Sequence, residues 1–168
     1  IVDPDASLLL LKSTMSIPHQ GGRRFDFRDL EYQILREWIA AGMTRDVKNL
    51  PRLVGLTASP HHATLYAPKT SVQLGITAEF SDGSTRDVTN LAVYDSSSLF
   101  VEVSPSGVAT AERFTQTTVT VRYLNHQIPI RLEFVPDRPN FVNTAPTPAN
   151  DLDAAVFAQL QRLRINPS

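Results

Sequence analysis

Apolar residues occupy every second position from Val72 to Phe80, and no other feature constrains the fold of this chain so strongly. Such alternation is typical of a strand with one buried and one solvated face. Asp82-Gly83 follows directly, a pair that tolerates the positive φ angles of a tight hairpin turn. We therefore predict an antiparallel hairpin at the centre of the chain.

Similar patterns extend this hairpin into a larger β module. From Leu53 onward, turn-forming residues separate short alternating runs at intervals of about 8 to 12 residues, as in small sandwiches and barrels. Strands are expected at 53–58, 63–67, 71–80, 86–94, 99–103, 108–112, 117–124 and 128–135. The last two are expected to be joined by a turn at 125–127. Residues 53–136 are therefore predicted to form a small antiparallel β-sandwich or barrel.

The N-terminal part of the chain carries helical patterns instead. One short helix is expected over 8–12 and a second over 30–41, with Asp29 as its N-cap and Gly42 as its left-handed C-terminal cap. The second helix gathers its apolar residues on one face: Leu30, Ile34, Leu35, Trp38 and Ile39. Two short helices bury little surface, so this face needs a partner from the β module or from outside the chain.

A polar linker at 44–52 and a proline-rich tether at 136–149 flank the β module. Beyond the tether, Asn150 or Asp151 is expected to cap a final amphipathic helix. Its apolar stripe has no obvious mate in the sequence: Leu152, Val156, Phe157, Leu160 and Leu163. Both ends of the chain therefore read as parts of longer domains, and the predicted fold is mainly β with short α-helical segments at both ends.

Composition argues against several classes of function. Sixteen Lys and Arg residues against 17 Asp and Glu leave a formal charge of −1 with no basic block, which argues against nucleic acid as a partner. The longest apolar run, Leu8 to Leu11, is too short to span a membrane. Cysteine is absent, so disulfides and thiol catalysis are excluded within these residues. No nucleophile-elbow, zinc-protease, P-loop or Rossmann motif occurs, and we predict no catalytic residues and no enzyme activity.

Two groups of side chains invite a metal-site hypothesis, and ordinary explanations outweigh it in both. His61 and His62 are adjacent, and neighbouring strand residues point to opposite faces of a sheet. Asp82, Asp87 and Asp95 match no calcium-loop spacing, and Asp82 is explained by turn chemistry. No metal site is therefore predicted.

The ordered motifs of the β module resemble the bacterial immunoglobulin-like group 2 domain, found in intimin- and invasin-type surface proteins. The matching segments are Leu74–Phe80, SDGSTRDVT at 81–89, YDSS at 94–97, VEVSPSGVATA at 101–111 and TTVTVRY at 117–123. Phe114-Thr115-Gln116 replaces a glycine that the family usually has before its T-x-T strand, so the turn there is expected to differ. The resemblance implies an immunoglobulin-like sandwich that acts as a spacer or an adhesion-type interaction module.

The flanking segments carry a second resemblance. Residues 1–48 are similar to the distal half of a planctomycete-type cytochrome c domain, and 137–168 to the tether and first helix of the uncharacterised domain that follows it in large exported proteins. This implies an exported location, periplasmic or at the cell surface, and partners among other domains of the same polypeptide or another protein chain. A glycan is a further candidate partner, because an exposed sheet face or edge strand of such a module could bind one.

The cytochrome resemblance also implies a ligand-bearing role for the N-terminal segment as the alternative function. His19, in the loop before the Trp38 helix, is the candidate axial haem ligand, and Met15 is the weaker one. The chain contains no CxxCH motif, so no cofactor is expected in these 168 residues alone. Haem c is expected only in an intact parent protein whose remaining sequence, or another chain, completes the electron-transfer domain.

Overall fold

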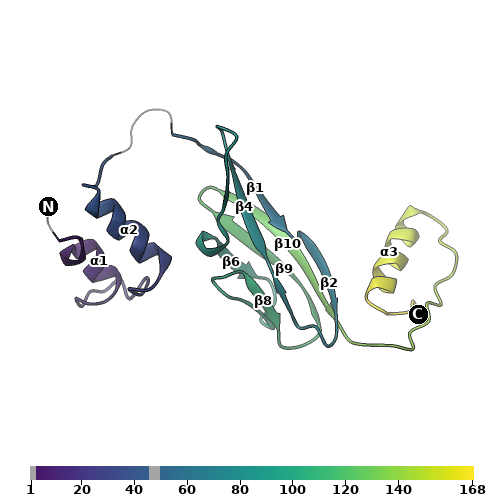
Figure 1. Cartoon of the computed structure of the whole chain (residues 1–168). Helices are drawn as coiled ribbons and strands as arrows, with labels where there is room; N and C mark the ends of the chain where they lie inside the picture. Colours follow the sequence, from purple (N-terminus) through teal and green to yellow (C-terminus); the bar gives the residue numbers. More distant parts are fainter. Residues whose placement is uncertain (1–2, 46–49) are drawn as a thin grey trace. The chain divides into compact units, whose positions relative to one another are not determined.

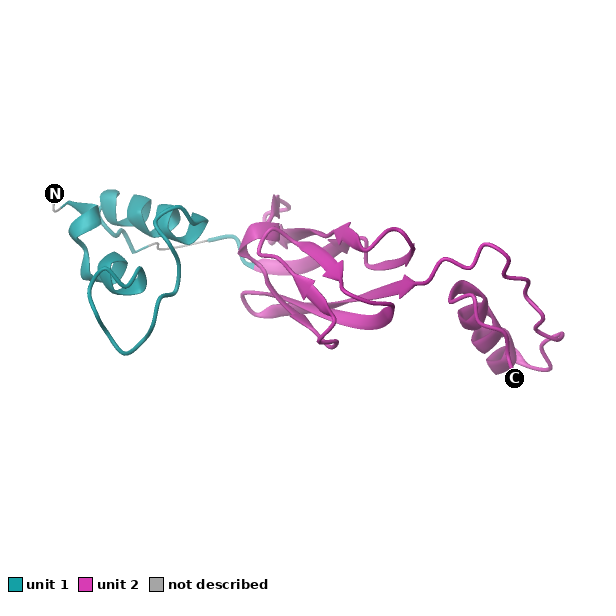
Figure 2. Ribbon diagram, turned by 90° about the horizontal axis from the view of Figure 1, so that it is seen from below, with its two compact units in different colours: residues 1–52 teal, residues 53–168 magenta. Residues whose placement is uncertain are grey.

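The computed structural model describes residues 3–45 and 50–168, and the chain divides into two compact units, residues 1–52 and 53–168 (Figure 2). Part of the linker predicted at 44–52 therefore lies outside the described residues, as does the end of the helical segment predicted at 1–48. No helix among the described residues is long and apolar enough to cross a membrane.

The first unit consists of three short helical elements: η1 (Pro4–Ala6), α1 (Leu8–Ser13) and α2 (Leu30–Ala40). Its small core contains Leu10, Tyr32 and Ile39. Asp5 joins these elements, because its Oδ1 accepts hydrogen bonds from Tyr32 Oη at 2.6 Å and from Arg36 Nε at 2.8 Å. These bonds hold η1 against α2.

Only one of the two apolar rows of α2 reaches this core. Leu30, Ile34 and Trp38, spaced four residues apart, are 39%, 44% and 42% exposed. Gly42 has φ 89° and ends the helix as predicted. Asp29 occupies the N-cap position without a capping bond, since its carboxylate accepts from the Asp26 amide at 2.7 Å instead.

The second unit is an immunoglobulin-like antiparallel β-sandwich followed by one helix (Figure 1), and this confirms the predicted fold class. One sheet contains β1 (Leu53–Ser59), β4 (Gly75–Phe80) and β5 (Thr85–Asp87), in that order. The second has the order β2 (His62–Tyr66), β10 (His126–Val135), β9 (Thr115–Tyr123) and β6 (Val93–Ser96). A small third sheet has the order β3 (Ser71–Gln73), β8 (Val108–Ala111) and β7 (Val101–Val103), and α3 is Asp151–Arg162.

The alternation in the sequence accounts for the core of the sandwich. Leu74, Ile76 and Ala78 are at most 1% exposed, as the pattern from Val72 to Phe80 predicts. The inward residues of β9 and β10 complete this core: Val119, Val121, Ile130, Leu132 and Phe134. Burial of these side chains is the main stabilising contribution to the sandwich.

The predicted strand at 71–80 is divided between two sheets. The Leu74 amide donates to the Gly107 carbonyl at 2.8 Å, so the chain leaves the third sheet there before it enters β4. Gly107 has φ 81°, and a Cβ at this position would lie 2.7 Å from the Leu74 carbonyl oxygen. The close backbone approach therefore requires glycine.

The prediction of one continuous strand at 86–94 is wrong. Asp87 Oδ1 accepts from both the amide and the hydroxyl of Thr89, at 2.8 and 2.6 Å. This local turn competes with strand pairing and leads into the short helix η2 (Thr89–Leu91), so β5 and β6 are separate strands.

The turn predicted at 125–127 is also misplaced. The chain reverses at Leu124 and Asn125, and His126 pairs with Tyr123 as the first residue of β10. Leu124 has φ 50°, a left-handed conformation that leucine rarely adopts, so composition does not signal this turn.

The first and last residues of the sandwich lie at its opposite ends. β1 leads directly into β2, and β2 pairs with β10 in parallel, from Arg131↔His62 to Val135↔Tyr66. The chain therefore enters at Leu53, at one end of the sandwich, and leaves at Val135, at the other (Figure 1). A ten-residue strand such as β10 spans about 30 Å, which sets the scale of this separation.

Candidate functional site

The structure places the predicted haem-ligand candidates in and before the loop that joins α1 to α2. His19 is half-buried, and its Nδ1 is buried without a hydrogen-bond partner among the described residues. Its ring lies over Gly21, where a Cβ would come within 2.5 Å of Nε2. Met15 follows Thr14, the C-cap of α1, with φ 61° and a side chain that is 41% exposed. Both ligand assignments stay predictions, and covalent attachment would require cysteines from outside this chain.

Each of the three aspartates considered for calcium has a local structural role. Asp82 accepts from the amide and hydroxyl of Ser84 at 3.0 and 2.6 Å and so shapes the β4–β5 turn. Asp87 makes the turn into η2, and Asp95 pairs with Arg122 across β6 and β9 at 2.6 Å. Within residues 3–45 and 50–168, no group of three or more His, Cys, Asp or Glu side chains is placed to hold a metal ion.

The most unusual polar group in the second unit is Glu133, which sequence reasoning missed. It lies on β10 between Leu132 and Phe134 and points away from the core, yet it is 0% exposed. An ionised carboxylate is buried only where partners replace its water. Burial of an outward-facing position means that another element covers this part of the sheet.

That element is α3, together with the edge strand β2. Gln159 Nε2 donates to Glu133 Oε1 at 2.8 Å, and Thr64 Oγ1 donates to Oε2 at 2.7 Å. Arg162 Nε lies 3.6 Å from Oε2 and His62 Nε2 lies 3.5 Å from it. Two hydrogen bonds and a nearby guanidinium thus compensate the buried charge.

These partners decide the ionisation of Glu133. Burial by itself raises the pKa of this carboxyl. The hydrogen bonds from Gln159 and Thr64, followed by the charges of Arg162 and His62, outweigh burial and hold the pKa below its ordinary value. Glu133 is therefore ionised at neutral pH.

Further polar contacts anchor the end of α3 to β2 and to the tether. Tyr66 Oη donates to the Arg162 carbonyl at 2.8 Å, and the Arg164 guanidinium stacks 4.3 Å from the centre of the Tyr66 ring. Arg164 also pairs with Asp137 at 2.9 Å, while Arg138 donates to the Arg164 carbonyl at 2.7 Å. No residue of α3 is fully buried, so this contact depends mainly on polar groups.

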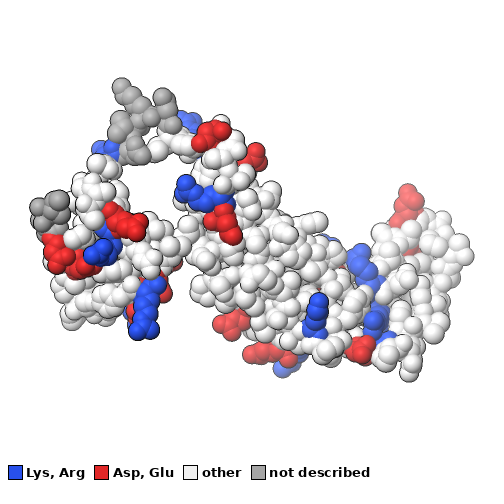
Figure 3. Space-filling model, viewed as in Figure 1, with Lys and Arg blue, Asp and Glu red and all other residues white. Residues whose placement is uncertain are grey.

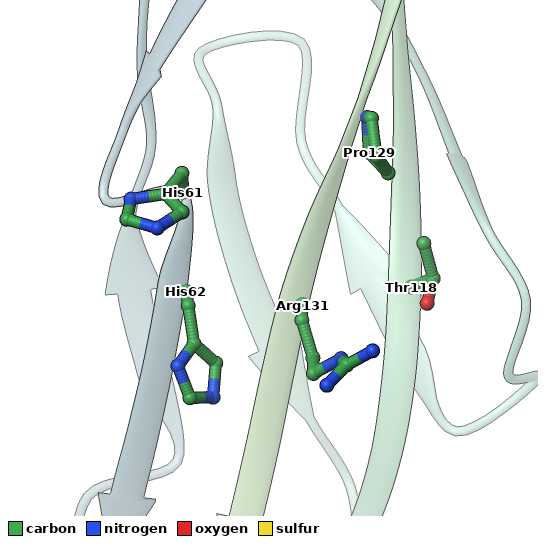
Figure 4. Close-up of a pocket in the computed structure, with 5 residues that line it drawn as sticks. All are labelled: His61, His62, Thr118, Pro129 and Arg131. Atoms are coloured by element: carbon green, nitrogen blue, oxygen red, sulfur yellow. The ribbon is translucent and has the colours of Figure 1, made fainter.

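Two shallow hollows lie on the same outward face, beside the Glu133 cluster. The first, of about 330 Å³, is lined by His61, His62, Thr118, Pro129 and Arg131 (Figure 4). The second, of about 520 Å³, is lined by Ser97, Gln116, Thr117, Thr118, Arg131 and Gln159. Thr118 and Arg131 belong to both, so the hollows are continuous. The sequence shows that Arg131 faces outward, but not that α3 supplies a wall.

Charge elsewhere on the surface is dispersed. On the face shown in Figure 3, basic and acidic side chains are interspersed, and much of the sandwich carries neither. The hollows around Arg131 are the candidate site whose lining holds hydroxyl, amide, imidazole and guanidinium groups and no carboxylate, unlike a third hollow of about 560 Å³ whose lining includes Asp95, Glu102 and Glu112.

The chain matches no protein-family profile, and no curated protein matches it. Among solved structures it is similar to domains 4 and 5 of the S-layer protein SbsC, at 14% identity over 51% of this chain and with a TM-score of 0.43. It is also similar to SbsC domains 1–6, at 17% identity over 55% of this chain (TM-score 0.45), and to rSbsC(31–844), at 17% over 53% (TM-score 0.43). The match spans 54% of the first of these chains and 14% of each of the other two, which is less than two thirds in every case.

Proposed function

We propose that this chain is a non-enzymatic spacer and interaction module of an exported multidomain protein. The observation that carries the proposal is the position of the two ends of the sandwich. Leu53 and Val135 lie at opposite ends, so a sandwich placed between two domains separates their attachment points by its own length. A domain with adjacent termini provides no such separation.

The pairing of β2 with β10 supports a mechanical role. Tension applied through Leu53 first loads β1 against β4 and then, through the short β1–β2 connection, loads β2 at its N-terminal side. Because β10 is loaded at its C-terminal side, the parallel strands β2 and β10 are pulled past each other. The hydrogen bonds between these strands are then strained together and not one after another. Such a pairing resists extension better than a hairpin opened from its free end.

The exported location and the neighbouring domains rest on sequence resemblance. The ordered motifs at 74–123 resemble those of the group 2 bacterial immunoglobulin-like domain, and residues 1–48 and 137–168 resemble its neighbours in large exported proteins. The proposal places the sandwich between a redox domain and a downstream domain.

Force spectroscopy tests the spacer role. The chain has no cysteine, so handles can be attached through introduced pairs, Leu50→Cys with Pro136→Cys for the natural ends. Unfolding should then occur as one event that releases about 240 Å of chain. The matched pair Phe114→Cys with Pro136→Cys opens the β9–β10 hairpin from its free end and should yield at a clearly lower force. Equal forces for the two pairs, or stepwise extension from the natural ends, would contradict the proposal.

A second candidate function rests on His19. Its half-buried ring and unpartnered Nδ1 suit a histidine that serves as an axial ligand in a completed cytochrome c domain. In the intact parent protein, a haem absorption band should change on His19→Ala and persist on Met15→Ala. Absence of haem from the purified parent protein rules this role out.

A further inference from the structure

Arg131 lies at the junction of the two hollows, and its side chain has no ion-pair or hydrogen-bond partner among the residues that the structure describes. Its backbone amide donates to the His61 carbonyl at 3.1 Å and fixes the strand. Its guanidinium has no carboxylate, carbonyl or aromatic ring as a partner within the described ranges, 3–45 and 50–168. Arg122, Arg162 and Arg164, by contrast, each pair with a carboxylate.

The groups around Arg131 are suited to an anion. Thr118 and Ser97 supply hydroxyls to the lining, Gln116 supplies an amide, and His61 and His62 supply imidazoles. No lining residue of either hollow is acidic. A guanidinium binds planar or tetrahedral oxyanions through two parallel hydrogen bonds, with hydroxyl donors completing the shell.

The nearby carboxylate of Glu133 does not oppose this reading. It lies two residues along the same face of β10, but Thr64 and Gln159 already donate to it and Arg162 lies beside it. The charge of Glu133 is therefore compensated within the contact between α3 and the sheet. Arg131 remains the uncompensated charge of the hollow.

The shape of the site favours a polymer over a free ion. These hollows are shallow and continuous, with volumes of about 330 and 520 Å³, so they hold much more than a single small anion. Their lining is polar, with Pro129 as the apolar surface at one end. An extended sugar chain can lie along such a surface with one of its acidic groups at Arg131.

We propose that this face binds an acidic polysaccharide, with a carboxylate or sulfate group held by Arg131 and the adjoining sugars lying against Thr118, Ser97 and Gln159. Binding at this site does not depend on the spacer function, because the Arg131 side chain takes no part in strand pairing. Since Gln159 belongs to α3, the helix forms one wall of the site, which is complete only while α3 is seated.

Calorimetric titration of residues 1–168 tests the proposal with three polymers: polygalacturonate, dextran sulfate and neutral dextran. Inorganic sulfate serves as the free-ion probe. The chain should bind at least one acidic polymer and should not bind neutral dextran. Preference between the two acidic polymers identifies the group as carboxylate or sulfate. Binding of inorganic sulfate as tight as that of the polymer would overturn the polymer assignment.

Variants locate the site. Arg131→Gln should weaken binding by about tenfold or more, as expected for loss of a charge-assisted contact. Arg86→Gln, which removes the same charge from the exposed strand β5, should change affinity by less than about twofold. The midpoint of chemical unfolding should be unchanged in Arg131→Gln, since its side chain has no partner to lose. Equal weakening by both variants, or no binding by the unmodified chain, would refute the site.

Discussion

Gln159 on α3 donates a hydrogen bond of 2.8 Å to Glu133 on β10, and this contact joins the last helix to the outward face of the sandwich. The bond satisfies a carboxylate that would otherwise be buried without enough partners. It also places Gln159 in the wall of the hollow beside Arg131. The helix after the tether is thus held to the sandwich by the fully buried side chain of Glu133 and its donors, together with the contacts of Tyr66 with Arg162 and Arg164.

Glu133→Leu should release α3 from the sheet. The substitution removes the acceptor for Gln159, Thr64 and Arg162, and we expect a loss of about 1 to 3 kcal/mol in the free energy of unfolding. Hydrogen exchange should show faster exchange in α3 with little change in the core strands. Glu79→Leu, at an exposed position of β4, is the matched control and should leave exchange in α3 unaltered. Unchanged protection of α3 in Glu133→Leu would refute the anchoring role.

The ionisation of Glu133 makes part of the stability depend on pH. Its pKa in the folded chain lies below the ordinary value of 4.5, so its contribution is complete above about pH 4.5 and is lost as the pH falls through the folded-state pKa. Asp82 and Asp87 have lowered pKa values as well, because Ser84 and Thr89 donate to them, and they contribute in the same direction.

Urea unfolding between pH 2.5 and 7 should separate the contribution of Glu133 from these others. The difference in stability between the unmodified chain and Glu133→Gln should be constant at neutral pH and should shrink below about pH 4.5. A difference that grows as the pH falls would mean that the pKa of Glu133 is raised and not lowered.

Gly107 and Gly83 form a matched pair for testing the close approach at Leu74. Both have φ 81°, but a Cβ on Gly107 would lie 2.7 Å from the Leu74 carbonyl oxygen, whereas a Cβ on Gly83 meets nothing within 4 Å. Gly83→Ala should therefore cost only the strain of a left-handed alanine, about 1 kcal/mol. Gly107→Ala should cost about 2 to 3 kcal/mol, because the β3–β4 connection must shift as well. Equal losses in thermal or urea unfolding would show that the contact relaxes freely.

The buried core of the first unit, to which α1 contributes Leu10, and the exposed apolar row of α2 should respond differently to truncation. Leu10→Ala removes a side chain that is 1% exposed from the small core of the first unit and should cost about 2 kcal/mol or more. Ile34→Ala truncates a side chain that is 44% exposed and should cost less than about 0.5 kcal/mol in this chain. The amide NMR signals of α2 should therefore broaden or shift in the first variant only. A large loss of stability in Ile34→Ala would show that the row of Leu30, Ile34 and Trp38 is covered by another part of the protein.

The sequence predicted what depends on local pattern and failed where distant residues meet. Alternation located the buried side chains of β4 and β10, and Asp82-Gly83 located a hairpin turn whose hydrogen bonds the structure shows. The burial of Glu133 could not be foreseen, because outward strand positions are ordinarily solvated and the covering helix lies 26 residues away along the chain.

The other differences have equally specific causes. Leucine at position 124 adopts φ 50° because the β9–β10 pairing imposes it, which residue preferences cannot indicate. Asp87 looked like a strand residue, but its side chain bonds Thr89 and ends the strand. For the candidate site, the outward direction of Arg131 follows from alternation, while its lack of a partner and the wall formed by α3 come only from the folded chain.

The polar contact between α3 and the sandwich affects how far the chain extends beyond Val135. Water can replace the hydrogen bonds and ion pairs that hold α3 to the sandwich. The helix can therefore detach without exposing a large apolar surface. When α3 detaches, the residues from Pro136 to Asn150 are free to straighten, and their full extension is about 50 Å. Release of α3 would therefore lengthen the connection between the sandwich and α3 without unfolding any strand.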